Sequence, residues 1–152
     1  MKPEKSWIER HRAGWLLVAV QFACLFWFIL KVEVIRLNGL MVLQLAGLTL
    51  GVAAVWSMRR SRLRIAPEPD ARASLVRSGV YRYLRHPMYT ALLLVFLPPA
   101  IVRGQWPEWL AAALLLLDLV LKLHYEERLL RRQFPEYVAY QQESWRLFPF
   151  LY

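Results

Sequence analysis

Arginine, histidine and tyrosine side chains gather around one predicted helix start in the middle of the chain. Gly79 suits a turn, and Pro87 suits the first position of a helix, where its missing N–H is not needed. His86 would then lie just before the helix, beside Arg85. A helix N-terminus with such cations beside it can bind a carboxylate or a phosphate. The residues leave one alternative open: the arginines only set membrane orientation, and His86 only caps the helix.

A second group of polar side chains lies on one face of a later predicted helix. Asp118, Lys122 and Glu126 are spaced i, i+4 and i+8, and Glu127 follows directly. An aspartate inside an apolar run is costly and indicates a functional site. The alternative is a structural pair with Lys122, whose ammonium would reach toward the membrane surface. Glu126 and Glu127 oppose the helix dipole, which favours a cationic or hydroxyl-rich ligand nearby.

Other common catalytic patterns are missing from the sequence. It has no Ser/His/Asp triad and no glycine-rich phosphate loop. The three histidines, His11, His86 and His124, are scattered, so no metal site is predicted. Cys24 is the single cysteine and lies in an apolar run, which predicts a packing residue and no internal disulfide.

The elements that hold these side chains are more apolar than those of a soluble domain. Apolar residues make up 58% of the 152 residues and charged residues 20%, against about 25% charged in ordinary globular proteins. The apolar residues come in blocks, and a membrane span needs about 20 of them. The first block is too long for a signal peptide and has no small-residue cleavage pattern. Four spans are predicted, at residues 13–30, 37–58, 87–102 and 108–123.

The third span is the weakest of the four. It is short, and Pro98 and Pro99 remove two backbone donors near its end. We expect this helix to bend or end there unless neighbours satisfy the freed carbonyls, with the irregular part packed against protein. Gln21 and Gln44, isolated amides within the first two spans, are predicted to form hydrogen bonds between helices.

The distribution of basic residues predicts the orientation. Of the 20 Lys and Arg residues, 17 lie in the N-terminal tail, the 59–86 loop and the segment from Lys122 onward, and 3 lie in the two opposite turns. Both termini are therefore predicted to be cytosolic, in an inner or plasma membrane. The net charge of +9 flanks apolar blocks, which favours membrane lipids as partners over nucleic acid.

These features predict an all-α, polytopic membrane helical bundle that forms a single domain over residues 1–152. About four transmembrane helices, the third short or kinked, would be followed by a cytosolic C-terminal tail. Aromatic residues alternate with charges in that tail, and Pro135 and Pro149 divide it into short helical pieces. It is too aromatic for a disordered segment, so it should fold back onto the membrane face. No pattern predicts an oligomeric state.

The polar residues of the second half resemble those of one superfamily. The matching residues are Arg85-His86-Pro87-Met88-Tyr89 after Gly79-Val80-Tyr81, then Glu126, Glu127 and Leu130, then Phe134, Tyr137, Tyr140, Arg146 and Pro149. This pattern resembles the isoprenylcysteine carboxyl methyltransferase and phospholipid N-methyltransferase superfamily. The resemblance covers residues 75–152, whereas residues 1–74 supply two spans and a basic loop.

The resemblance implies a methyltransferase that uses S-adenosylmethionine in a cytosol-facing pocket. His86 and Tyr89 would hold its methionine part, and Glu126 or Glu127 its ribose hydroxyls or amino group. The adenosine pocket would be closed by Tyr137, Tyr140, Arg146 and Pro149. Catalytic roles would fall to Arg85, His86 and Glu127.

The methyl acceptor would be a lipid or another lipophilic molecule that enters between the spans. A carboxylate acceptor, as in isoprenylcysteine, would need only positioning, by Arg82 or Arg85. A phospholipid-like amine would first lose a proton, and Glu126, Glu127 or His86 would be the candidate base. The residues do not decide between the two acceptors.

Two other classes remain as alternatives. The same Arg-His-Pro-x-Tyr pattern and tail resemble the C-terminal part of membrane sterol reductases, which use NADPH but are much longer. A non-catalytic membrane scaffold with a degenerate pocket is the other alternative.

Overall fold

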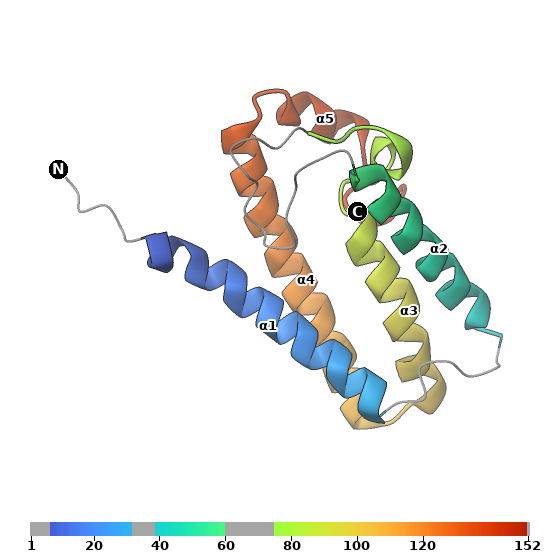
Figure 1. Ribbon diagram of the computed structural model, residues 1–152. Coiled ribbons are helices and arrows are strands. Elements are labelled where there is room, and N and C mark those ends of the chain that lie inside the picture. The colour runs from blue at the N-terminus through green and yellow to red at the C-terminus, as the bar shows by residue number, and fades with distance from the viewer. Residues whose placement is uncertain (1–6, 32–38, 60–74, 152) are drawn as a thin grey trace.

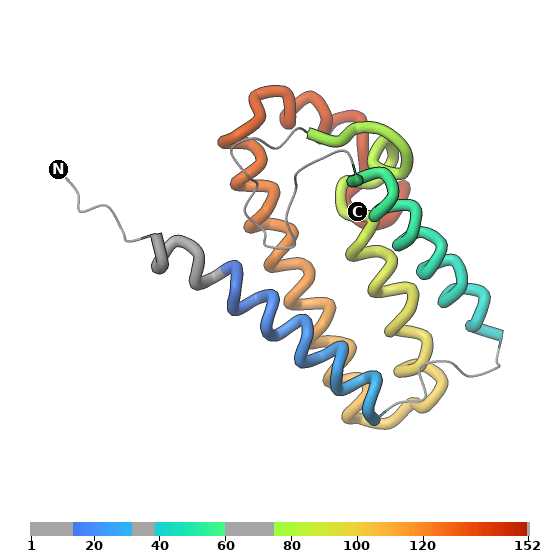
Figure 2. The backbone as a smooth tube through the Cα atoms, viewed as in Figure 1, coloured from blue at the N-terminus to red at the C-terminus, as the bar shows by residue number. Residues whose placement is uncertain are grey.

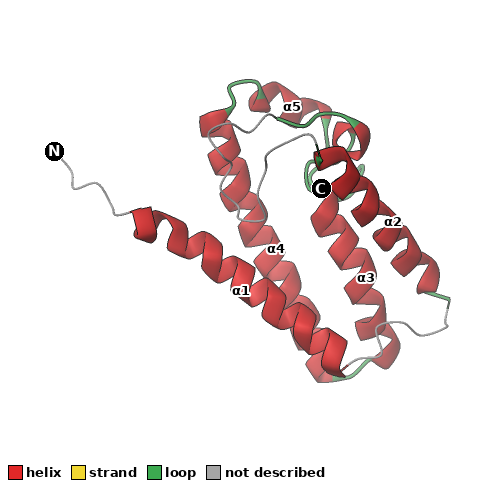
Figure 3. Cartoon of the chain, viewed as in Figure 1, coloured by secondary structure: helices red, strands yellow, loops and turns green. Residues whose placement is uncertain are grey.

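The computed structural model describes residues 7–31, 39–59 and 75–151, with side chains from residue 14 onward. Figure 1 shows its helices. They are α1 (Trp7–Lys31), α2 (Met41–Met58), the 3-10 helix η1 (Gly79–Arg82), α3 (Pro87–Arg103), α4 (Trp106–Gln133) and α5 (Tyr137–Glu143). The described residues contain no strand (Figure 3), so the all-α prediction is confirmed for this part of the chain.

The four long helices alternate in direction and pack in two pairs. Helix α2 packs on α3, α1 packs on α4, and contacts between α3 and α4 join the pairs. Figure 2 shows that η1, the start of α3, the end of α4 and α5 all lie at one end of the bundle. The polar segments that are distant in sequence therefore meet at that end.

Two helices are long and apolar enough to cross a membrane. These are Gly14–Lys31 within α1, and Met41–Met58, which is the whole of α2. Only 11% of the α2 span is buried inside the protein, whereas the core helix of a soluble protein would be mostly covered. An apolar helix with most of its surface outward is suited to lipid. Helix α3 is apolar but shorter, as predicted for the third span.

Helix boundaries differ from the predicted spans mainly at the ends. Helix α1 begins at Trp7 and α2 at Met41, while residues 37 and 38 of the predicted second span lie outside the described residues. Helix α4 continues past the predicted span to Gln133. The turns of α4 after residue 123 are too polar for a membrane span, but their residues can still form a helix. They end where Phe134 precedes Pro135, because a residue before proline disfavours the helical conformation.

The proline pair in α3 does not end the helix, which continues through Pro98 and Pro99 to Arg103. Pro99 has no N–H to donate to the carbonyl of Val95, four residues earlier. The Gln44 side chain of α2 donates to that oxygen instead, at 3.1 Å. Both prolines are buried. The predicted packing of this region against protein and the predicted inter-helix bond of Gln44 are therefore confirmed.

Glycine permits the close approach of α2 to α3. A Cβ added at Gly47 would lie 2.7 Å from Leu94 Cβ and 2.9 Å from the Ala91 carbonyl oxygen. At Gly51, one turn later, the nearest atom is Ala91 Cβ at 3.4 Å, an ordinary contact. Small residues that let backbones approach are characteristic of helix packing in lipid.

Gly47→Ala should therefore destabilise the bundle, while Gly51→Ala should not. The added methyl at position 47 meets backbone, so the helices must separate, at a cost of about 1–3 kcal/mol. At position 51 the better helix propensity of alanine should leave stability equal or slightly higher. Thermal unfolding of both variants in detergent compares them directly. Equal melting temperatures for Gly47→Ala and the wild type would contradict this description of the interface.

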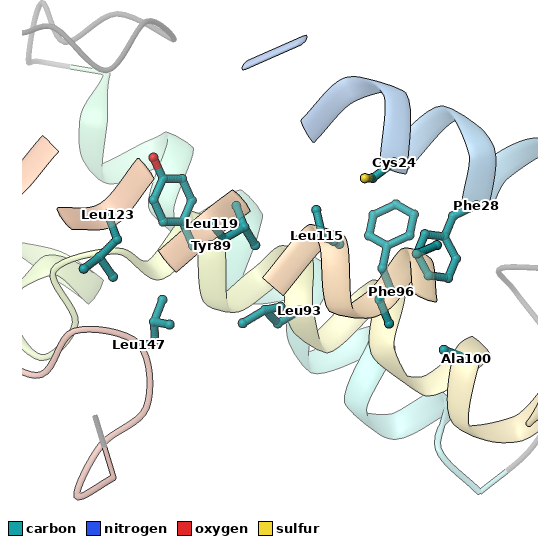
Figure 4. Close-up of a cluster of buried hydrophobic side chains, with 12 residues drawn as sticks. Cys24, Phe28, Tyr89, Leu93, Phe96, Ala100, Leu115, Leu119, Leu123 and Leu147 are labelled. Atoms are coloured by element: carbon teal, nitrogen blue, oxygen red, sulfur yellow. The ribbon is translucent and has the colours of Figure 1, made fainter. Parts of the chain in front are cut away.

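Buried apolar side chains from α1, α3, α4 and the C-terminal segment form the main core (Figure 4). Cys24 and Phe28 come from α1, Leu93 and Phe96 from α3, and Leu119 from α4. Cys24 is thus a buried packing residue without a disulfide, as predicted. Figure 4 also shows Leu147 of the C-terminal segment in the same cluster. The tail therefore folds back onto the helices, which connects the core to the polar end of the bundle.

Candidate functional site

The C-terminal segment is attached by backbone hydrogen bonds to the segment that leads into α3. Arg85 N–H donates to the Trp145 carbonyl at 2.7 Å, and His86 N–H donates to the Arg146 carbonyl at 3.1 Å. Trp145 N–H in turn donates to the Tyr83 carbonyl at 2.9 Å. These bonds hold the arginine and histidine motif against the tail, which is about 60 residues later in the chain.

The turn that leads into this motif depends on a glycine. Gly79 has a φ of +62°, which disfavours other residues, and a Cβ there would collide with Ser57 Oγ at the end of α2. The predicted turn at Gly79 is confirmed. It starts η1, whose buried Tyr81 accepts a hydrogen bond at its carbonyl from the Tyr140 hydroxyl of α5. This contact anchors α5 to η1.

His86 is the N-cap of α3 and Pro87 its first residue, as the sequence predicts. The His86 ring stacks on Tyr89 with 5.3 Å between ring centres. It also lies between two carboxylates, with Nδ1 at 3.5 Å from Glu126 Oε2 and Nε2 at 3.7 Å from Glu127 Oε1. Burial alone would lower the pKa of His86, but the interactions with Glu126 and Glu127 raise it above its ordinary value. Its imidazole is therefore favoured in the charged form.

Glu127 is the centre of a buried network of charges. Arg85 Nε lies 2.8 Å from its Oε1. Its Oε2 faces Gln141 Nε2 at 3.1 Å, Arg146 Nε at 3.4 Å and Arg131 Nη2 at 3.6 Å. The side chain is only 1% exposed. With His86 Nε2 at 3.7 Å from Oε1, five neighbours thus share its two oxygens, which makes Glu127 the point where α4, α5, the tail and the segment before α3 are joined.

The Arg85 guanidinium continues this network into the tail. Its Nη1 donates to the Gln141 carbonyl at 3.0 Å and to the Ser144 carbonyl. Burial alone would raise the pKa of Glu127, but its interactions with His86 and Arg85, including their positive charges, lower it to about 2. The carboxylate is therefore ionised at neutral pH, and Arg85 is its principal counter-ion.

Glu126 is adjacent in sequence but lies in different surroundings. It accepts a hydrogen bond from the Tyr89 hydroxyl and faces His86 Nδ1. Its side chain is 18% exposed, against 1% for Glu127. Glu126 is therefore the carboxylate of the pair that a ligand can reach.

Among the buried polar atoms of this region, His86 Nε2 and the Tyr137 hydroxyl have no hydrogen-bond partner in the described residues, and Nε2 has only its ion pair with Glu127 at 3.7 Å. Burial raises the pKa of the Tyr137 phenol, so it stays a potential donor. Buried polar groups are normally satisfied. The pair of open positions therefore indicates where a polar ligand could bind.

The structure brings the predicted site residues together at one end of the bundle, with one exception. The residues that converge are Arg85, His86, Tyr89, Glu126, Glu127, Tyr137, Tyr140 and Arg146. Pro149 is exposed in the terminal turn. That these residues bind a cofactor stays a prediction.

Sequence reasoning missed three residues of the network: Arg131, Gln141 and Ser144. Arg131 could have been found, because it lies four residues after Glu127 on the same helix face. Gln141 and Ser144 gave no such signal. Their contacts with Glu127 and Arg85 exist only because α5 folds back over the end of α4.

Comparison with known proteins identifies one family. The family model described as phospholipid methyltransferase matches residues 35–137, and this range includes His86, Tyr89, Glu126 and Glu127. A comparison with curated protein sequences gives no significant match. The match covers more than half of the chain and includes the polar end of the bundle. The chain therefore belongs to the phospholipid methyltransferase family, within the membrane methyltransferase superfamily that its motifs resemble.

Proposed function

We propose that the protein is an S-adenosylmethionine-dependent methyltransferase that methylates a lipophilic acceptor at the cytosolic membrane surface. Membership of a methyltransferase family supports the reaction class. The observation that carries the proposal is the partly open Glu126 beside His86 and Tyr89, at the end of a bundle with apolar outer surfaces. This arrangement supports a reaction between a polar cofactor and a lipophilic acceptor.

The residues at this end suit such a cofactor. Its ammonium and sulfonium cations match the accessible carboxylate of Glu126, and its hydroxyl and carboxylate groups match the open His86 Nε2 and Tyr137 hydroxyl. The ring of Tyr89 offers a face for a cation. When bound, S-adenosylmethionine supplies a methyl group activated by a positively charged sulfur. Glu127 is already shared by five partners, so we assign it to holding the site together.

Glu126 is the best candidate base if the acceptor is an amine. It is partly open and already hydrogen-bonded by Tyr89, whereas Glu126 and Glu127 raise the pKa of the buried His86, which makes its neutral form less available as a base. For a carboxylate acceptor, Arg85 is occupied by Glu127. The exposed Arg82 is then the better candidate for positioning it.

The membrane topology that supports this function has four spans and cytosolic termini. Helix α4 carries Asp118 and Lys122, which are 3% and 4% exposed, so both charges face the bundle interior while leucines face outward. A helix with inward charges can span lipid. The basic residues then place the polar end in the cytosol, in an inner or plasma membrane.

The test combines binding with methyl transfer. We expect the purified protein in nanodiscs to bind S-adenosylhomocysteine by calorimetry and not NADPH. With tritiated S-adenosylmethionine, label should move into the lipophilic fraction of a total lipid extract. NADPH binding without S-adenosylhomocysteine binding would favour the reductase class, and binding of neither would favour a scaffold.

A further inference from the structure

Asp118 is a carboxylate in the middle of the bundle that the proposed reaction does not use. Its residue is 3% exposed, and neither Oδ1 nor Oδ2 has a hydrogen-bond partner among the described residues. Burying an unpaired carboxylate is unfavourable, and more so within a membrane. A side chain with this cost calls for a hydrogen-bond donor, and the described residues supply none to it.

Lys122 is on the same helix face but is held by other groups. Its Nζ donates to Gln21 Oε1 of α1 at 2.9 Å and lies 5.4 Å from the centre of the Tyr89 ring. The alternative from the sequence is therefore wrong in two respects: Lys122 is buried and does not reach the membrane surface, and Asp118 accepts no hydrogen bond from it. The two charges still attract each other. The predicted bond of Gln21 between helices is confirmed. Lys122 balances the charge of this region, and both Asp118 oxygens are still open.

The position of Asp118 connects it to the site. It lies on the buried face of α4 with Leu115 and Leu119, which Figure 4 shows beside Cys24 of α1 and Tyr89 of α3. Cys24, Tyr89, Leu115 and Leu119 belong to one buried cluster. Asp118 is two helical turns, about 12 Å, from Glu126 along α4. Tyr89 and Lys122 connect Asp118 to Glu126: Lys122 lies one turn after Asp118, its Nζ is 5.4 Å from the centre of the Tyr89 ring, and the Tyr89 hydroxyl donates to Glu126.

We infer that Asp118, with Lys122 beside it, is a second binding subsite for the lipophilic acceptor, inside the membrane. It receives a hydrogen-bond donor, an ammonium or a hydroxyl, carried on the lipophilic part of the acceptor away from the atom that is methylated. This inference rests on the proposed function. A carboxylate in a dry environment binds such donors strongly and repels an anion. An acceptor that enters between α1, α3 and α4 would place its donor there.

The test compares three amphiphiles that differ only in the polar group: dodecylamine, dodecanol and dodecanoate. We expect wild-type protein in nanodiscs to bind the amine or the alcohol more tightly than the carboxylate. Asp118→Asn should raise the Kd for the preferred amphiphile by about tenfold or more. If the wild type prefers dodecylamine over both other amphiphiles, the natural donor is an ammonium group. If dodecylamine and dodecanol bind similarly, the natural donor is a hydroxyl group. The exposed Glu136→Gln should bind like the wild type.

The melting temperature of the ligand-free protein distinguishes a role of Asp118 in binding from a role in folding. Because the carboxylate is unpaired, Asp118→Asn and Asp118→Leu should keep or raise the melting temperature of the ligand-free protein. A lower melting temperature in both variants would assign Asp118 to folding and overturn the inference.

S-adenosylhomocysteine binding by the same samples separates the two proposals. Intact S-adenosylhomocysteine binding with equal amphiphile affinities in the wild type and Asp118→Asn would overturn the subsite alone. A wild type that does not bind S-adenosylhomocysteine would overturn the proposed function instead.

Discussion

Glu127→Ala should lower the free energy of unfolding by roughly 3–5 kcal/mol and abolish S-adenosylhomocysteine binding. The substitution leaves Arg85 buried without its counter-ion, while Arg85 still donates to the Gln141 carbonyl. It also removes the acceptor for Gln141 Nε2. The segment before α3, the end of α4 and α5 would then lose their common contact. Denaturant unfolding in detergent measures the first effect, and calorimetry measures the second.

The buried ion pair offers an internal check on this result. Replacing both partners, as Arg85→Leu with Glu127→Leu, should recover part of the lost stability, because no unpaired charge remains. Ligand binding should stay absent, since the tail is no longer held by Arg85. The exposed Glu143→Gln in α5 is a matched control and should match the wild type. A Glu127→Ala protein with wild-type stability would show that the network does not hold the site together.

Glu126→Gln should have the opposite profile, with unchanged stability and a kcat/KM that is at least about 100-fold lower. Its side chain is partly open, and the glutamine oxygen can still accept from Tyr89. What is lost is the negative charge that we assign to the cofactor cation and, for an amine acceptor, to proton removal. The tritiated-methyl assay measures the effect with the acceptor that the lipid extract identifies.

The Tyr89→Phe variant shows how much the orientation of the Glu126 carboxylate contributes to activity, apart from its charge. Without the tyrosine hydroxyl the carboxylate keeps its charge but loses its hydrogen bond, so activity should fall less than in Glu126→Gln. If Glu126→Gln retained wild-type kcat/KM while Glu127→Gln lost it, the roles that we assign to the two carboxylates would be reversed.

The sequence by itself determined the features that depend on neighbouring residues. Pro87 at the first position of α3 and the end of α4 before Pro135 follow from the backbone limits that proline imposes. The apolar blocks determined which helices have outward apolar surfaces, since a span needs a continuous run of such residues. The family also follows from the sequence, since the family model matches residues 35–137.

Only the tertiary structure decided what the individual polar groups do. Glu126 and Glu127 are adjacent, but successive residues point about 100° apart around a helix, so one faces Tyr89 and the other faces Arg85. The partner of Gln44 depended on how α2 meets α3 at the proline pair. Lys122 donates to Gln21 of α1, and the Asp118 oxygens accept no hydrogen bond from the described residues. Spacing along the chain determines which face a side chain is on, whereas its partner depends on helices from distant parts of the chain.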